Sequence, residues 1–383
     1  MLPQLHRHPW MDEQIDSFRG QVRRLIAENF TPKLEGWRNQ GYIPRESWRR
    51  LAEIGALLPE LDECYGGSGA TLAYQLVVTD EISRAEIPTV VGVHSIAAHY
   101  IRDYGTDEQK NRWLPKLTSG EMLVGIAMTE PSCGSDLKAL RTTARRDGDE
   151  YVINGSKIFI SNAGTGNLLI VAVRTGESGS RGVSLIVLET ENLPGFSVGR
   201  RLKKIGSHAG DTSELFFDNV RVPVTHLLGG KEGCGFVQLM SQLPYERMIL
   251  AVGAAAVIER AVELTVEYTK QRKAFGQPLA DFQNTRFKLA ECASTAHIVR
   301  TFVNDCIQRL LDGKLDVEAA YMAKWWCTEQ QCRVTDECLQ LFGGYGYMEE
   351  YPIARLYADS RMQKIVGGSN EVMKDLIARK LFA

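Results

Sequence analysis

The spacing of apolar residues changes twice along this chain. Near the start, Ile15, Phe18, Val22 and Ile26 follow one another at steps of three and four residues, which places them on one face of a helix. The same pattern predicts further helices over residues 72–86, 90–103 and 107–117. We therefore expect residues 1–123 to form a helical domain.

The middle of the chain has short β-rich runs in place of helical periodicity. Apolar runs separated by Gly, Ser and Asp predict strands over 168–173, 183–188 and 215–222. Residues 151–158 predict a hairpin with Asn154-Gly155 as its turn, because this dipeptide tolerates the positive φ angles of a type I′ turn. We expect residues 124–235 to form a small antiparallel β-unit, either a barrel or a sandwich.

Helical periodicity returns toward the C-terminus. Long helical patterns cover residues 250–270, 279–311, 315–342 and 368–382. The small residues between Ala251 and Ala256 would let neighbouring helices approach closely. Residues 236–383 are therefore expected to form a helical bundle, and the order of elements predicts an α+β fold.

Length and composition are those of a globular protein with more than one core. The chain has 383 residues, of which 44% are hydrophobic and 24% charged, and its formal net charge is −2. Lys and Arg are nowhere concentrated enough for a nucleic-acid groove, so we expect no nucleic-acid partner. No apolar run approaches the roughly 18–20 residues of a membrane span, so we expect no membrane insertion. The N-terminal residues lack the apolar stretch of a secretory signal.

The cysteines and histidines indicate the compartment and argue against a metal. The eight cysteines are scattered without a CxxC pair, which is typical of free thiols, and we predict a cytoplasmic location. The seven histidines form no HExxH motif or similar ligand set, so we expect no metal site.

Several motifs along the chain resemble those of one family. The segments Ala127–Asp136 (AMTEPSCGSD) and Asn154–Asn162 (NGSKIFISN) resemble consecutive signatures of acyl-CoA dehydrogenases. Further matching segments follow in family order at Thr212–Pro223, Gln271–Gly276, Leu339–Gly346 and Gly367–Glu371. The resemblance spans nearly the whole chain. It implies an N-terminal helical domain, a middle β-barrel and a C-terminal four-helix bundle, assembled as a homotetramer.

The resemblance also implies the reaction. Members of this family bind FAD, convert an acyl-CoA thioester to the trans-2-enoyl-CoA, and pass the electrons to an electron-transferring flavoprotein. A carboxylate removes the α-proton while flavin N5 takes the β-hydride. The cofactor thus carries the redox chemistry, and the protein supplies orientation, a base and electrostatics. We interpret the chain as an acyl-CoA dehydrogenase of fatty acid β-oxidation.

The resemblance places FAD contacts in two parts of the chain. The matched positions in the middle domain are Met128, Thr129, Ser135, Phe159, Ile160 and Ser161. Those in the C-terminal domain are Arg272, Phe275, Gln283, Gln340, Gly343, Gly344, Ser369 and Glu371. Arg272 matches an arginine that reaches across a subunit interface to the FAD diphosphate, which its planar, two-pronged donor group suits. Taken alone, Arg272 equally suits an exposed charge at a helix C-terminus.

The catalytic base departs from the commonest family pattern. Many relatives have a glutamate where Gly367 stands here, after Val366. The long-chain and isovaleryl branches have a small residue at that position and a glutamate in an ER motif, which matches Glu246-Arg247. The resemblance therefore assigns the base to Glu246 and leaves the backbone N–H of Gly367 to stabilise the enolate oxygen. The matched substrate-binding positions are Ser135, Val237, Tyr245, Arg247 and Gly368.

Other interpretations stay open at the level of sequence. Taken alone, Glu246 is also explained as a carboxylate near a helix N-terminus that interacts favourably with the helix dipole and has no catalytic role. Within enzymes, an acyl-CoA oxidase or a flavin monooxygenase on the same fold is the alternative, although oxidases of the family are generally longer chains. Outside enzymes, Gly367 suggests a non-catalytic acyl-CoA-binding subunit, against which the Pro244–Arg247 motif argues.

Overall fold

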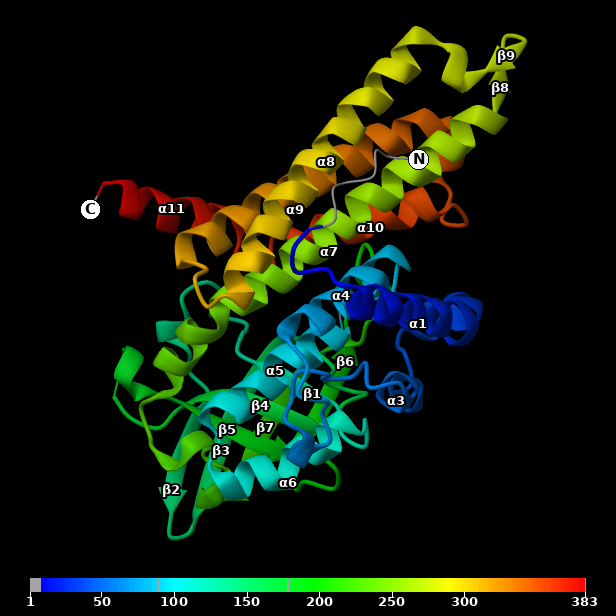
Figure 1. Cartoon of the computed structure of the whole chain (residues 1–383). Coiled ribbons are helices and arrows are strands. Elements are labelled where there is room, and N and C mark those ends of the chain that lie inside the picture. Colours follow the sequence, from blue (N-terminus) through cyan, green and yellow to red (C-terminus); the bar gives the residue numbers. More distant parts are fainter. Residues whose placement is uncertain (1–7, 89, 178, 383) are drawn as a thin grey trace.

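The computed structural model describes residues 8–88, 90–177 and 179–382. A curled sheet lies at one end of the molecule beside a set of shorter helices, and a bundle of long helices extends away from both (Figure 1). The N-terminal helices are α1 (Glu13–Asn29), α2 (Leu34–Gln40), α3 (Arg45–Glu53), α4 (Leu72–Arg84), α5 (Val90–Tyr104) and α6 (Asp107–Thr118). The helices predicted in this region are confirmed.

Capping residues fix where two of these helices begin. Asp12 precedes α1, and its carboxylate accepts a hydrogen bond from the N–H of Ile15 at 2.8 Å. Thr106 and Gln109 form a capping box at the start of α6, in which each side chain accepts from the other residue's N–H. The predicted apolar face of α1 is confirmed, because Val22 and Ile26 are buried.

The middle of the chain forms one seven-stranded sheet. Its strands are β1 (Val124–Ala127), β2 (Thr143–Asp147), β3 (Glu150–Ser161), β4 (Leu168–Arg174), β5 (Val183–Glu189), β6 (Phe196–Arg201) and β7 (Thr212–Pro223). The strand order is β1-β4-β2-β3-β7-β6, with β5 paired to β4. The expectation of an antiparallel unit is wrong for β4, which pairs in parallel with β1 and, at Thr143 and Arg174, with β2.

The hairpin turn predicted at Asn154-Gly155 is also wrong. Strand β3 continues through this dipeptide, and the turn that joins β2 to β3 lies at Gly148 and Asp149. The pairing of β3 with β7 instead shifts register between Ile153 and Gly155. Gly155 has φ +145, and a Cβ there would lie 2.7 Å from Thr142 Cα, so glycine serves a bulge and a close approach.

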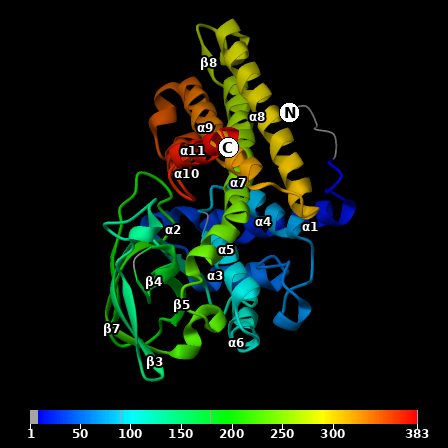
Figure 2. The ribbon, with the colours of Figure 1, turned by 90° about the vertical axis from the view of Figure 1, so that its left-hand side faces the viewer.

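The C-terminal part is a bundle in which three long helices pack together with shorter ones. Its helices are α7 (Gly235–Gln271), α8 (Gln283–Leu311), α9 (Val317–Phe342), α10 (Pro352–Gln363) and α11 (Asn370–Leu381), with a small hairpin of β8 (Lys273–Ala274) and β9 (Gln277–Pro278) after α7. Helix α10 was not among the predicted helices. Helix α7 runs from the sheet end to the far tip of the bundle (Figure 2).

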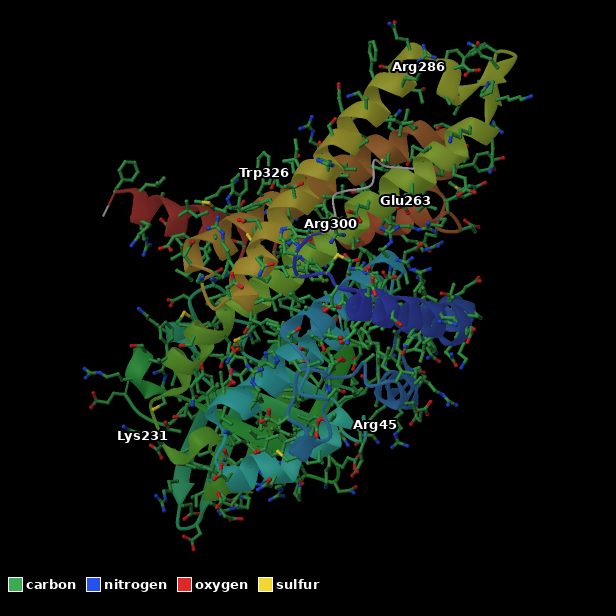
Figure 3. All side chains as sticks on the ribbon, in the orientation of Figure 1. Arg45, Lys231, Glu263, Arg286, Arg300 and Trp326 are labelled. Atoms are coloured by element: carbon green, nitrogen blue, oxygen red, sulfur yellow. The ribbon has the colours of Figure 1, made fainter. Side chains whose placement is uncertain are left out.

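A buried ionic network joins the N-terminal helices to the bundle. Arg300 on α8 donates hydrogen bonds to Asp80 on α4 and to Glu259 on α7, each at 2.7 Å. Burial alone would raise the pKa of Asp80, but the charges of Arg300 and Arg19 hold it at about 2. Arg300 lies where the bundle meets the shorter helices (Figure 3), so the network fixes the two parts against each other.

Among the helices that the structure describes, none combines the length and the apolar character that a membrane crossing requires.

Candidate active site

Glu246 lies where the long helix α7 passes the N-terminal helix α5. Glu246 is only 6% exposed, and its Oε1 accepts a hydrogen bond from the hydroxyl of Tyr100 at 2.7 Å. Burial raises the pKa of Glu246, while the Tyr100 hydrogen bond and the charge of Arg247 act in the opposite direction. The Oε2 atom accepts no hydrogen bond from any residue that the structure describes, and it is not fully enclosed. A carboxylate with one free oxygen and a raised pKa is suited to general-base chemistry.

Gly367 lies against the same face of α7 as Glu246. A Cβ at Gly367 would lie 2.5 Å from Cδ1 of Leu250, which is one helical turn beyond Glu246. Gly367 also has φ +64, a conformation that is strained for residues with a side chain. The structure therefore brings the two predicted catalytic positions together, and a side chain at position 367 would require a strained backbone and a shift of the Leu250 side chain.

A buried lysine holds the turn that contains Gly367 and Gly368. Lys324 on α9 is fully buried and donates hydrogen bonds to Gly368 O at 2.7 Å and to Asn370 Oδ1 at 2.9 Å. Burial and the charge of Arg247 lower the pKa of Lys324 to about 8. Arg247 lies with its guanidinium carbon 4.4 Å from the ring centre of Tyr321. Its Nε and Nη1 atoms have no partner among the described residues, which leaves two donors beside the turn.

Two of the predicted substrate contacts differ in exposure. Tyr245 is buried, its hydroxyl is 2.6 Å from Ser95 Oγ, and its ring stacks on His99 at a centroid distance of 4.3 Å. Tyr245 thus packs on α5. Val237 is 66% exposed near the start of α7. Direct contact of either residue with substrate stays a prediction.

The sheet brings Met128 and Thr129, two predicted flavin contacts, next to the part of β3 that carries the predicted contacts Phe159, Ile160 and Ser161. Ile158 N donates to Thr129 O at 2.9 Å, and Lys157 Nζ donates to Met128 O at 3.0 Å. Phe159 is 64% exposed and has φ +62, because β3 bulges between Lys157 and Ile160. The bulge turns an aromatic ring outward beside the backbone of Met128 and Thr129.

The other predicted residues of the sheet differ in exposure. Ile160 is buried in the sheet core and pairs with Ser213 on β7, whereas Ser161 is half-buried and pairs with Thr212. Ser135 is exposed on the loop that follows β1. Glu130 fixes this loop, because its carboxylate accepts from the N–H groups of both Arg141 and Thr142.

A second group of predicted cofactor residues gathers at the far tip of the bundle. Its exposed members are Arg272, Phe275, Gln283, Gln340, Gly343 and Gly344. Arg272 lies over the ring of Tyr345 at 5.5 Å, which joins the end of α7 to the segment after α9. The β8–β9 hairpin and Arg286 mark this tip in Figures 1 and 3. At 1.5 Å per residue, Arg272 is on the order of 40 Å along α7 from Glu246.

Ser369 and Glu371 lie beside the Gly367–Gly368 turn, at the start of α11. The Ser369 hydroxyl caps this helix by accepting the N–H of Val372 at 3.4 Å. Glu371 is exposed, and a hydrogen bond from its own backbone N–H, with one from Ser369, lowers its pKa. One chain therefore carries two groups of predicted FAD contacts that do not meet within it.

The residues present fit FAD. The exposed ring of Phe159 offers a flat apolar face, and the adjoining strand ends offer backbone groups for the polar edge of a flavin. The exposed guanidinium of Arg272 suits a diphosphate. The sheet and the tip of the bundle lie at opposite ends of the molecule (Figure 1), so the two groups are separate within one chain.

Two residues of the site escaped prediction. Tyr100 lies in an ordinary helical pattern, and no sequence signal connects it with Glu246. Lys324 gave a signal that could have been used, because it stands among apolar residues in AAYMAKWW, where a charged side chain is costly without partners.

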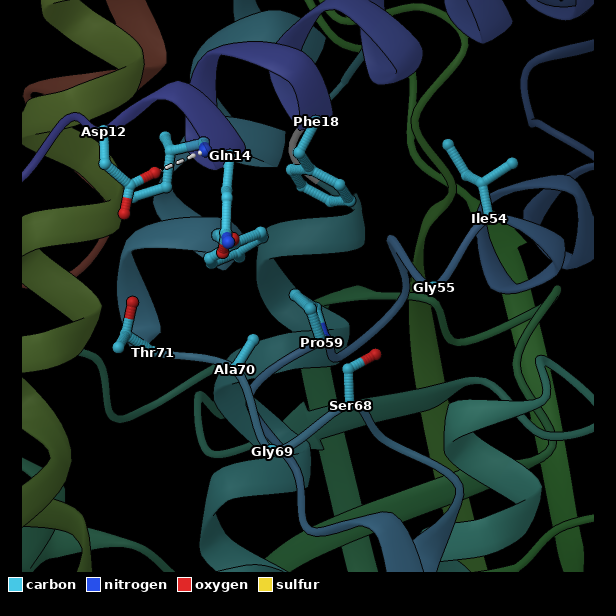
Figure 4. A pocket seen from close by; sticks show the side chains of 12 residues that line it. Asp12, Gln14, Phe18, Ile54, Gly55, Pro59, Ser68, Gly69, Ala70 and Thr71 are labelled. Carbon is cyan, nitrogen blue, oxygen red and sulfur yellow. Dashed lines mark hydrogen bonds between the residues drawn. The ribbon is translucent and has the colours of Figure 1, made fainter.

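A separate hollow of about 480 Å³ lies between the start of α1 and the loop before α4 (Figure 4). The rings of Phe18 and Tyr74 lie 5.0 Å apart in its wall, and Asp12 and Ser68 are at its rim. None of the predicted site residues lines this hollow, so it is distinct from the site at Glu246.

Comparisons with known proteins agree along the chain. Acyl-CoA dehydrogenase family models match residues 12–121 (N-terminal domain), 125–220 (middle domain) and 233–382 (C-terminal domain). The mitochondrial long-chain specific acyl-CoA dehydrogenase of Sus scrofa is 42% identical over 371 residues, which are 96% of this chain and 86% of that protein.

Solved structures of related proteins have the same fold. The crystal structure of an acyl-CoA dehydrogenase from Geobacillus kaustophilus is 44% identical, with a TM-score of 0.96, and the match covers 98% of this chain and 100% of the other. Butyryl-CoA dehydrogenase from Megasphaera elsdenii is 32% identical, with a TM-score of 0.92 over 97% of this chain and 99% of the other.

Proposed function

Because this chain belongs to the acyl-CoA dehydrogenase family, it is an FAD-dependent enzyme that dehydrogenates an acyl-CoA thioester, and we propose that Glu246 removes the α-proton. The observation that carries this assignment is the buried Glu246 carboxylate with its free Oε2. The absence of a carboxylate at Gly367, where the sequence motif of other members has its glutamate, supports the same residue. The predicted α+β fold, family and enzyme class are confirmed by the family models and by the solved structures.

The residues of the chain have separable roles in the proposed mechanism. Glu246 takes the α-proton, and the electron pair of the broken C–H bond forms the new double bond. The N–H of Gly367 stabilises the negative charge that develops on the thioester oxygen. Lys324 keeps that N–H in place by holding the carbonyl of Gly368. FAD, when bound, supplies the acceptor for the β-hydride. The remaining proposed substrate contacts are Ser135, Val237, Tyr245, Arg247 and Gly368.

Anaerobic addition of acyl-CoA thioesters of increasing chain length tests this function. The absorbance of bound flavin should be lost with at least one thioester, and the preferred length identifies the substrate. A chain that binds acyl-CoA while its flavin stays oxidised would be the non-catalytic subunit.

We propose an electron-transferring flavoprotein as the electron acceptor. The flavin reduced by substrate should be reoxidised by such a flavoprotein and should release little hydrogen peroxide in air. Measuring peroxide after substrate reduction checks this, and rapid release would favour the acyl-CoA oxidase. A cytoplasmic location stays a prediction, which the free state of all eight cysteines supports.

We propose a homotetramer in which each FAD contacts residues of a second subunit. Arg272→Ala should weaken FAD retention and the tetramer together, because the diphosphate contact would cross the subunit boundary. The loss of a charge-assisted contact of about 1.5–3 kcal/mol corresponds to roughly 10- to 100-fold weaker FAD binding. Equilibrium dialysis of FAD and sedimentation velocity measure the two effects.

Arg286→Ala is the matched control for this prediction. Arg286 is also exposed near the tip, where its Nη1 donates to Asp281 O, and no cofactor role is assigned to it. Its replacement should leave FAD affinity unchanged. Equal FAD affinity in the Arg272 variant and the parent would contradict the proposed contact.

A further inference from the structure

We propose that Tyr100 is a positioning residue for the base: its hydroxyl holds Oε1 of Glu246, so that Oε2 is the oxygen that receives the substrate proton. This inference rests on the proposed role of Glu246. It adds a residue from the N-terminal helical part to a reaction whose other proposed groups lie on the sheet and the bundle.

The position of the Tyr100 hydroxyl is fixed by its burial and by its neighbours on α7. Tyr100 is fully buried on α5, and its hydroxyl lies 2.7 Å from Glu246 Oε1 and 3.5 Å from Leu239 O, which is about two turns before Glu246 on helix α7. The ring belongs to a buried apolar cluster with Ile101 and Leu239, which leaves it little room to move. The hydrogen bond therefore fixes the rotamer of Glu246 from a neighbouring helix.

The free oxygen is distinguished from the held one by exposure as well as by bonding. Oε1 is bonded to Tyr100, whereas Oε2 has no partner among the described residues and still has accessible surface. In a carboxylate that is otherwise buried, the accessible oxygen is the one that a substrate can reach. The Tyr100 hydrogen bond thus decides which oxygen acts as the base.

The charged and titratable groups around Glu246 come from few elements. Helix α5 contributes Tyr100, with Tyr104 at a ring distance of 6.2 Å from it, and helix α7 contributes Arg247. Burial makes the neutral carboxyl favourable, and the Tyr100 donor offsets part of this effect. Loss of that donor should therefore raise the pKa of Glu246 further, and the acid limb of the rate profile should move to higher pH.

Tyr100→Phe removes the donor and keeps the ring. We expect the pKa that governs flavin reduction to rise by about one to two pH units, with a rate about 10- to 100-fold lower on the acid limb and KM nearly unchanged. An infrared titration of the protonated carboxyl band, assigned by its absence in Glu246→Gln, measures the same pKa without turnover. Tyr104→Phe is the matched control on α5 and should leave both the pKa and the rate unchanged.

The outcomes separate this inference from the proposed function. If Glu246→Gln stops flavin reduction but Tyr100→Phe leaves the carboxyl pKa unchanged, the positioning role is wrong and Glu246 remains the base. If Tyr100→Phe lowers the melting temperature and lowers the rate equally at all pH values, Tyr100 has only a packing role, which also overturns the inference. If Glu246→Gln reduces its flavin normally, the base assignment itself is wrong.

Discussion

Glu246→Gln is expected to slow reduction of the bound flavin by acyl-CoA about 10²- to 10⁴-fold. Gln keeps the shape of the side chain and a hydrogen-bonding tip but cannot take a proton, so the loss should appear in the chemical step. The upper part of the range applies, because Glu246 is buried and a solvent base cannot replace it. Anaerobic stopped-flow measurement of flavin absorbance gives the rate, while FAD content and acyl-CoA affinity should be nearly unchanged.

The same variant makes a stability prediction with a defined sign. Burial raises the folded-state pKa of Glu246 above its unfolded value, so its contribution is favourable below the unfolded pKa and is lost as pH rises through the folded pKa. Glu246→Gln should therefore melt higher than the parent near neutral pH, and the difference should vanish toward acid pH. Thermal melts over a pH series measure this. A variant with parental flavin-reduction rate would show that another carboxylate is the base.

The order of helical and β-rich segments could be predicted because each segment has a pattern that is local in the sequence. The apolar face of α1 and the extended helical patterns of α8 and α9 are visible in any short window of the sequence. Glu246, the proposed base, is predicted through a resemblance over consecutive residues. Its neighbour Gly367 was identified in the same way, and the structure places the two against one face of α7.

The errors and omissions have a common physical cause. Asn154-Gly155 has the local chemistry of a turn, but the pairing of β3 with β7 and the close approach of Thr142 decide its conformation. Tyr100 and Glu246 are 146 residues apart in the sequence, and only the packing of α5 on α7 brings them together. Contacts between distant segments leave no periodicity in the sequence, so the support of a catalytic residue is harder to predict than the residue itself.

Lys157→Met is expected to lower the free energy of unfolding by about 3–5 kcal/mol, because it leaves the buried carboxylate of Glu130 without its cation. The two side chains are 0% and 3% exposed and their charged atoms lie 2.8 Å apart. Burial alone would raise the pKa of Glu130, but Lys157 and the N–H groups of Thr142 and Arg141 hold it below its ordinary value. The stabilising contribution of Glu130 is thus present above its unfolded pKa and is lost as pH falls through the folded one.

The double variant Lys157→Met with Glu130→Gln isolates the charge from the packing. It removes the unpaired carboxylate and keeps an acceptor for the two backbone N–H groups, so it should recover part of the lost stability. Urea unfolding of the parent, the single variant and the double variant gives the comparison. Since Lys157 also bonds Met128 O beside the exposed ring of Phe159, the single variant should retain less FAD as well. A single variant that unfolds at the parental urea concentration would mean that the ion pair contributes nothing to the stability of the fold.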